Sequence, residues 1–177
     1  MNIQALVQKT LSTKAPAATI LVRIILGGVF FTEGIQKFLF SEALGEGRFE
    51  NIGIPAPYVM ASFVGVVEIV FGALLLLGLL TRLATIPLVI DISTAIATTK
   101  IPLLFGSGPE PNLQGAQFGV WGMLHSGRVD FSMFLGLIFL LIVGAGGWSL
   151  DALLARKMAP VKNKDAYSVP HVSRTSH

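Results

Sequence analysis

The 177-residue chain contains no cysteine, and this absence excludes several kinds of redox and metal site. Without thiols the chain cannot form disulfides, attach haem covalently or ligate an iron–sulfur cluster. Histidine is almost as scarce, and its three positions are His125, His171 and His177. The last two lie in a polar C-terminal stretch, so the apolar part of the chain cannot offer two histidine ligands to a haem. We therefore expect no haem, iron–sulfur or other metal site built from this chain.

Charged residues are also few. Charged residues make up 13% of the chain, against about 25% in an ordinary soluble domain. Hydrophobic residues reach 53%, which is too many for a disordered chain or for one soluble core. The net charge of +3 would favour nucleic acid in a soluble protein, but here the basic residues gather outside the apolar runs. We therefore predict an integral membrane protein that contacts the lipid bilayer and no nucleic acid.

Four apolar segments are each long enough to cross a membrane, which takes roughly 17 to 25 helical residues. Thr81-Arg82 alone joins the second segment to the third, so these two helices must form an antiparallel hairpin. An even number of spans places both termini on one side, and the excess of lysine and arginine there indicates the cytoplasm. The predicted spans cover approximately residues 17–38, 58–80, 83–104 and 130–148.

The predicted fold is an all-α membrane protein, a four-transmembrane-helix bundle over residues 17–157 with both termini in the cytoplasm. Residues 1–16 are expected to form a tail or a short interfacial helix, because apolar side chains recur there at helical spacing. Residues 158–177 are polar and basic and are expected to form a disordered tail. The absence of a cleavable targeting segment favours a bacterial inner (plasma) membrane.

Charged side chains inside a span are costly in hydrocarbon, so they face protein or water. Glu68 shares one helical face with Ala61, Gly65 and Gly72, the kind of small-residue stripe along which another helix packs closely. It also lies nearest the middle of the membrane, with no obvious cation at its own level. We predict that Glu68 takes part in proton exchange or donates a hydrogen bond to a bound carbonyl ligand.

Helical phase and depth indicate partners for the other charges. Arg23 and Asp91 face inward about 9 and 12 Å from the cytoplasmic ends of their helices, so they are expected to pair. Thr94 shares the face of Asp91 and is expected to line the same ligand site. Glu33 and Lys37 form an i, i+4 pair near the outer end. These pairs either order a binding site or only fix the register of the helices.

The outer end of the bundle holds two further candidates. Lys100 lies half a turn from Asp91 on the third span, so we expect it to extend to the outer surface. Residues 106–128 are rich in glycine and proline at first and apolar afterwards. This segment either folds back as a lid carrying Trp121 and His125, or lies in the interface with the tryptophan among lipid headgroups and the histidine in water.

The order of these features resembles the DoxX family of small four-span membrane proteins, over roughly residues 18–157. The resemblance implies a four-helix bundle and an oxidoreductase subunit, because the namesake is linked to a membrane thiosulfate:quinone oxidoreductase and other members to oxidative-stress complexes. It supplies no established catalytic motif. The residues that carry it are Arg23, Gly27, Phe30, Gly34, Lys37-Phe38, Gly53-Ile54-Pro55, Pro57, Glu68, Thr81-Arg82, Asp130 and Trp148-Ser149-Leu150-Asp151-Ala152.

The leading functional interpretation is a quinone-interacting subunit of a membrane-associated oxidoreductase or oxidative-stress system, with Glu68 exchanging a proton with the quinone. The sequence offers no site for an electron-carrying cofactor, so we expect a protein partner or a homo-oligomer. One alternative is a non-enzymatic scaffold that anchors a soluble partner. Another is a small-solute or proton transporter that uses the polar face of Asp91, Thr94 and Thr98. The substitution Glu68→Gln separates proton chemistry from scaffolding.

Overall fold

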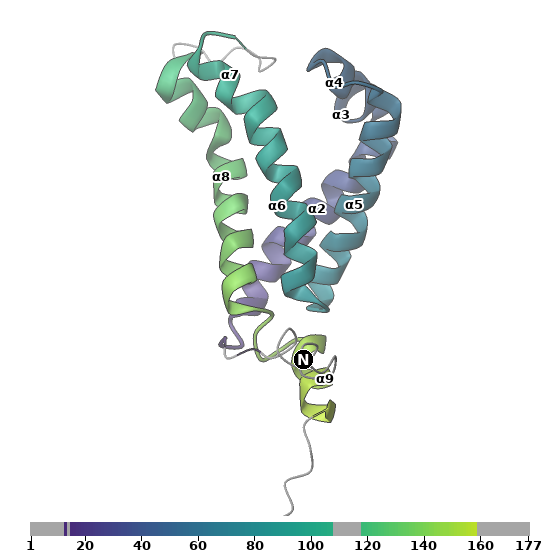
Figure 1. Cartoon of the computed structure of the whole chain (residues 1–177), viewed down its shortest axis with the longest axis vertical. Coiled ribbons are helices and arrows are strands. Elements are labelled where there is room, and N and C mark those ends of the chain that lie inside the picture. Colours follow the sequence, from purple (N-terminus) through teal and green to yellow (C-terminus); the bar gives the residue numbers. More distant parts are fainter. Residues whose placement is uncertain (1–12, 14, 108–117, 159–177) are drawn as a thin grey trace, which may run out of the picture.

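The computed structural model describes Thr13, residues 15–107 and residues 118–158, and each regular element in these ranges is a helix (Figure 1). Four of the helical runs are long and apolar enough to cross a membrane, which confirms the predicted all-α, four-span fold. The four runs are α2 (Thr19–Leu39), α5 (Pro57–Leu77), the continuous α6 (Thr81–Ala95), η1 (Ile96–Lys100) and α7 (Ile101–Leu104), and α8 (Gly119–Val143).

The predicted tails lie largely outside the described residues. Among the residues that are described, the start of α2 and the short helix α9 (Leu150–Met158) lie at the same end of the bundle (Figure 1). This placement agrees with an even number of spans. The assignment of that end to the cytoplasm stays a prediction.

The first three predicted spans agree with the structure to within three residues at each end, but the fourth is wrong. Instead of 130–148, the helix α8 covers Gly119–Val143. It ends early because Gly144 and Gly146 adopt positive φ angles of 84° and 82°, a backbone conformation that glycine tolerates and a right-handed helix does not. It begins early because the segment around Trp121, expected to be a loop, continues the same helix.

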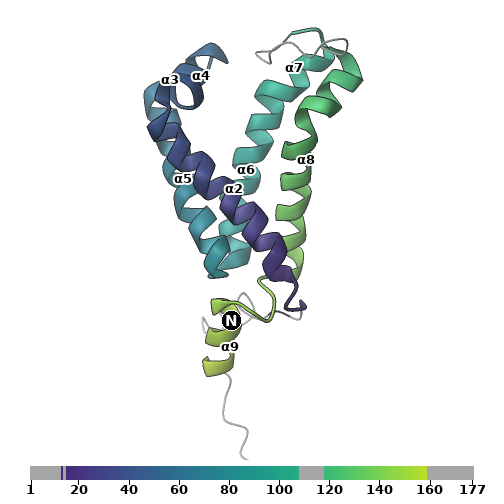
Figure 2. The same ribbon diagram turned by 180° about the vertical axis from the view of Figure 1, so that it is seen from behind.

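The spans form two arms that lie close at the α9 end and diverge toward the other end (Figures 1 and 2). One arm is α2 packed along α5, with the short helices α3 (Ser41–Leu44) and α4 (Glu46–Asn51) at its far end. The other arm is α6 to α7 packed against α8. Apolar side chains from all four spans fill the core between the arms, among them Leu26, Phe30, Leu75, Leu88, Leu137 and Leu140.

Glycines set the close approach of α2 to α5. A Cβ atom added at Gly34 would lie 2.7 Å from the carbonyl oxygen of Gly65, and one at Gly27 would lie 2.9 Å from that of Gly72. Backbones this close let helices associate in lipid, where the hydrophobic effect offers no drive between them. The buried face of α5 is the predicted stripe that includes Glu68. The predicted inward orientation of Glu68 is therefore confirmed.

Candidate functional site

A cavity of about 390 Å³ lies between the two arms and is lined by residues from every span and from α4. This volume falls within the range of small-ligand sites, roughly 300 to 1,000 Å³. Much of the wall is apolar, including Val29, Phe30, Val64, Ile92 and Met133. Its charged lining residues are Glu33, Lys37, Arg48, Glu68, Asp91, Lys100 and Asp130.

Three of these charged residues meet near the middle of the bundle, and we call Lys37, Glu68 and Asp91 the Lys37 cluster. Lys37 Nζ lies 2.6 Å from Glu68 Oε2, and the two side chains are only 11% and 6% exposed. Asp91 lines the same cavity, where its charge interacts with those of Glu68 and Lys37. The cluster therefore joins α2, α5 and α6 on the cavity wall.

The Lys37 cluster corrects two sequence-based pairings. Glu68 does have a cation beside it, because the long side chain of Lys37 reaches it from a position near the outer end of α2. The salt bridge of Lys37 therefore runs to Glu68 on another helix, while its expected partner Glu33 lies elsewhere on the cavity wall. Asp91 interacts with Glu68 and Lys37, so its expected pairing with Arg23 is wrong.

The composition of the Lys37 cluster suits it to hold one exchangeable proton. With both carboxyls ionised its net charge is −1, and with one proton shared between Glu68 and Asp91 it is neutral. A hydrogen bond between two carboxyl groups requires such a proton, because an ionised carboxylate can only accept. The cluster can thus give up or take a proton beside the cavity while Lys37 balances the remaining negative charge.

Beyond Asp91 along the third span, the cavity wall formed by α6 and η1 is polar. Thr94 and Thr98 both line the cavity, as the sequence predicts for their helical face. Their hydroxyls donate to the carbonyl oxygens of Ile90 and Thr94, at 2.9 and 2.8 Å. Each hydroxyl proton is therefore used within the helix, and the oxygen lone pairs can accept a hydrogen bond from a ligand or water.

A second charged group, which the sequence analysis missed, contains Lys100, Ser126 and Asp130, and we call it the Lys100 cluster. Lys100 is 6% exposed, donates to Ser126 Oγ at 3.2 Å and lies 3.8 Å from Asp130 Oδ2. The predicted extension of Lys100 to the surface is therefore wrong. Asp130, at the start of the predicted fourth span, was the available sequence signal for a buried cation nearby.

Arg23 lies far from this cavity and stabilises the other end of the bundle. Its guanidinium is almost fully buried and donates four hydrogen bonds to backbone carbonyls. Two acceptors, Leu75 and Leu76, belong to the last turn of α5, whose carbonyls have no partner within the helix. The other two, Ala145 and Trp148, belong to the turn after α8. Arg23 is thus placed as a helix cap and a clamp, away from any ligand in the cavity.

Asp151 stabilises the start of α6, the helix that follows α5 along the chain. Its Oδ1 accepts from the backbone N–H of Leu80 at 2.7 Å, and its Oδ2 accepts from that of Thr81 at 3.0 Å. A carboxylate at this point satisfies unpaired N–H groups and opposes the positive end of the α6 dipole. Asp151 itself lies in the first turn of α9, but the helix start that its carboxylate stabilises is that of α6. Its charge also interacts with that of Arg23.

Comparison with known proteins identifies the family of the chain. Residues 18–101 match the DoxX family. An uncharacterized membrane protein of Mycobacterium tuberculosis, Rv3486, is 50% identical over 149 residues, which cover 84% of this chain and 88% of that protein. The chain belongs to the DoxX family.

A more distant relative of this DoxX protein carries a functional name. "Putative oxidoreductase CatD" of Bacillus subtilis is 33% identical over 92 residues, which cover 52% of this chain and 66% of that protein. No solved structure matches the chain at a significant level. Within the described ranges, no group of three or more histidine, aspartate or glutamate side chains could hold a metal ion.

The residues that carry the DoxX resemblance fall into two groups in space. Arg23 and the Trp148-Ser149-Leu150-Asp151 motif meet at the α9 end, where they hold the helix termini together. Lys37, Glu68 and Asp130 line the cavity toward the other end. The first group explains how the bundle is held together, and the second offers groups for ligand chemistry.

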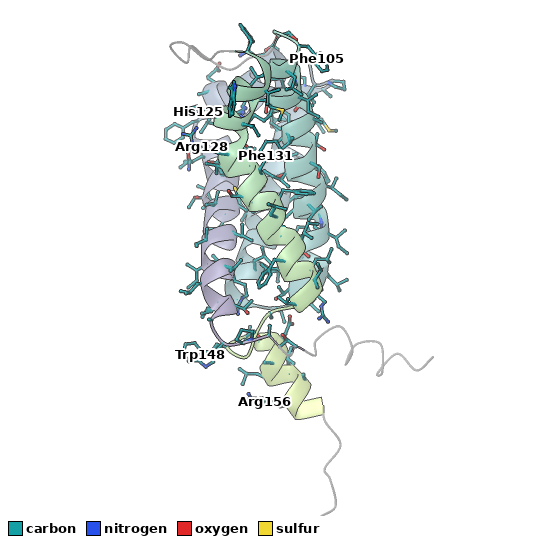
Figure 3. All side chains as sticks on the ribbon, turned by 90° about the vertical axis from the view of Figure 1, so that its left-hand side faces the viewer. Phe105, His125, Arg128, Phe131, Trp148 and Arg156 are labelled. Atoms are coloured by element: carbon teal, nitrogen blue, oxygen red, sulfur yellow. The ribbon has the colours of Figure 1, made fainter. Side chains whose placement is uncertain are left out.

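Trp121 and His125, the candidate lid residues, lie on α8 and do not line the cavity. Trp121 is 77% exposed, and His125 is exposed at the end of the bundle away from Trp148 and Arg156 (Figure 3). The lid interpretation is therefore wrong for these two side chains. An interfacial position, the other interpretation, fits an exposed tryptophan at the end of a span.

Proposed function

We propose that this DoxX protein binds the ring of a quinone in its cavity and acts as a quinone-interacting subunit of a membrane-associated oxidoreductase or oxidative-stress system. The observation that carries the proposal is the Lys37 cluster, a buried lysine beside two carboxyl groups on a largely apolar wall. A small planar ligand needs this combination of apolar surface and a few fixed polar groups. A cavity of about 390 Å³ suits the ring, and a long apolar tail would remain among the lipids.

The chemistry of the ligand matches what the cluster can supply. Reduction of a quinone takes up two electrons and two protons, and each ring carbonyl becomes a hydroxyl. In our proposal Glu68 gives a proton to one ring oxygen, as a general acid within reach of it. Lys37 stabilises the negative charge that develops on that oxygen. Asp91 passes on the replacement proton, which reaches it from water along the polar wall of Thr94 and Thr98.

Electrons would come from a partner oxidoreductase, because the chain has no cysteine to take part in thiol redox chemistry. The name of the CatD relative points the same way. A scaffold would gain nothing from charged groups placed around an internal cavity, where each is costly in a membrane. We further propose a bacterial inner membrane with the α9 end in the cytoplasm, which turns the cavity end outward.

The test is the quinone content of the purified protein. Wild type, Glu68→Gln and the control Glu50→Gln are purified in mild detergent from quinone-containing membranes, and bound quinone is quantified by mass spectrometry. Glu50 is exposed on α4 and undergoes the same carboxyl-to-amide change outside the cavity. Wild type and control should carry close to one quinone per chain. Glu68→Gln should carry several-fold less, because a neutral amide is a weaker hydrogen-bond donor than the carboxylic acid that it replaces.

Two results would contradict the proposal. Quinone content in wild type no higher than in an unrelated membrane protein purified the same way would exclude a quinone site and favour the scaffold. Equal content in wild type and Glu68→Gln would exclude the role given to Glu68. The Glu68→Gln variant is expected to assemble normally, because Asp91 still offers Lys37 a carboxylate.

A further inference from the structure

The Lys100 cluster faces the same cavity as the Lys37 cluster, and all three of its residues come from the arm that contains α6 and α8. Lys100 comes from the end of η1, and its partners Ser126 and Asp130 come from α8. Lys37 and Glu68 come from α2 and α5. The cavity therefore has a cation with a carboxyl partner on each side.

The backbone of the third span is shaped in a way that places Lys100 there. In a regular α-helix nine residues turn about 900°, so Lys100 would lie half a turn away from Asp91 and face lipid. Instead, Ile96–Lys100 form a π-helical segment, whose wider turns rotate the following residues. As a result Asp91 and Lys100 line one cavity, and the neighbours Thr99 and Lys100 are both buried. Such π segments are frequent at functional sites.

The partners of Lys100 hold it without removing it from the cavity. Ser126 accepts at 3.2 Å, and the carboxylate of Asp130 lies 3.8 Å away, which is an ion-pair distance rather than a hydrogen bond. The Asp130 side chain is 23% exposed, whereas that of Lys100 is 7% exposed. Asp130 is therefore the more exposed member of the ion pair, and an ammonium with three N–H donors can serve several acceptors.

We propose that Lys100, positioned by Ser126 and Asp130, binds the second carbonyl oxygen of the quinone whose first oxygen meets the Lys37 cluster. This inference rests on the proposed function and deepens it. The ligand class is then a dione with carbonyls at opposite ends of a ring, held at both ends. The second proton of quinone reduction reaches the second oxygen through Lys100, and Asp130 resupplies it from water.

The test compares two bicyclic ligands of similar size that differ in the number of carbonyls. One is a 1,4-naphthoquinone with a short alkyl chain, and the other is a tetralone with the same chain and one carbonyl. Dissociation constants are measured in detergent for wild type, Lys100→Met and the control Lys157→Met, whose lysine is exposed on α9. Wild type and control should bind the dione at least about tenfold more tightly than the ketone, and Lys100→Met should lose that advantage.

The outcomes separate this inference from the proposed function. If Lys100→Met keeps the preference for the dione, or loses affinity for both ligands equally, Lys100 does not bind the second oxygen, and the quinone site itself stands. If wild type binds neither ligand, both proposals fail. If Lys100→Met does not yield folded protein, Ser126→Ala serves instead, because it releases Lys100 from one partner and should reduce the preference for the dione several-fold.

Discussion

Replacement of Asp151 by asparagine tests how the α9 end of the bundle is held together. Asp151 is 2% exposed, and its two oxygens accept from the N–H groups of Leu80 and Thr81 at 2.7 and 3.0 Å. Asparagine keeps one acceptor oxygen and turns an amide NH₂ toward the other N–H, so one buried donor loses its partner. That loss costs about 1 to 3 kcal/mol. Removal of the charge from the start of α6 adds roughly 0.3 to 2 kcal/mol.

Together these terms predict a loss of about 1.3 to 5 kcal/mol, or roughly 3 to 20 °C in melting temperature for a protein of this size. The assay is thermal unfolding of the purified protein in detergent, followed by circular dichroism. Glu50→Gln is the control, because it makes the same chemical change on an exposed side chain and should leave the melting temperature within a degree or two. A melting temperature of Asp151→Asn equal to that of the control would refute the reasoning.

Three further predictions concern packing, topology and the lid. Gly34→Ala should lower the melting temperature by several degrees, because its Cβ would meet the α5 backbone at 2.7 Å, whereas Gly28→Ala, with no atom within 4 Å, should not. The chain lacks cysteine, so single-cysteine variants can be labelled with a membrane-impermeant maleimide. Glu50→Cys should react in intact cells and Lys157→Cys only after lysis, and the reverse pattern would place α9 outside. His125→Ala should leave bound quinone unchanged in the mass-spectrometric assay, because His125 does not line the cavity.

Residue spacing predicts the faces of α2 and α5 well, because small residues and charges repeat there at helical intervals. Glu68 is buried on the stripe with Gly65 and Gly72, as the spacing predicts. The expected cost of a bare charge in lipid makes this a strong inference. Sequence thus locates the side chains that must avoid lipid, among them Glu68, which lines the cavity.

The interaction partner of a buried charged side chain is harder to predict than the helix face on which it lies. The similar depths of Arg23 and Asp91 along straight helices predicted an ion pair between them. Instead, the four hydrogen bonds that Arg23 donates go to backbone carbonyl oxygens. Every residue has a carbonyl, so sequence carries no mark of the ones that a guanidinium will reach. The burial of Lys100 could not be predicted for another reason. A π-helical segment changes which residues share a helix face, and the composition of the segment does not reveal it.

The Lys37 cluster makes a prediction that distinguishes a coupled charge group from three independent side chains. Lys37→Met leaves two nearby carboxyls without a cation, and removal of one partner from a buried ion pair costs about 3 to 5 kcal/mol. Adding Glu68→Gln to that variant removes one of the two carboxyls, so the double variant should melt at a higher temperature than Lys37→Met alone. Glu68→Gln alone should have a small effect, because Asp91 still balances Lys37. Additive melting temperatures across the four proteins would mean that the charges do not act together, and the cluster could then not hold a shared proton.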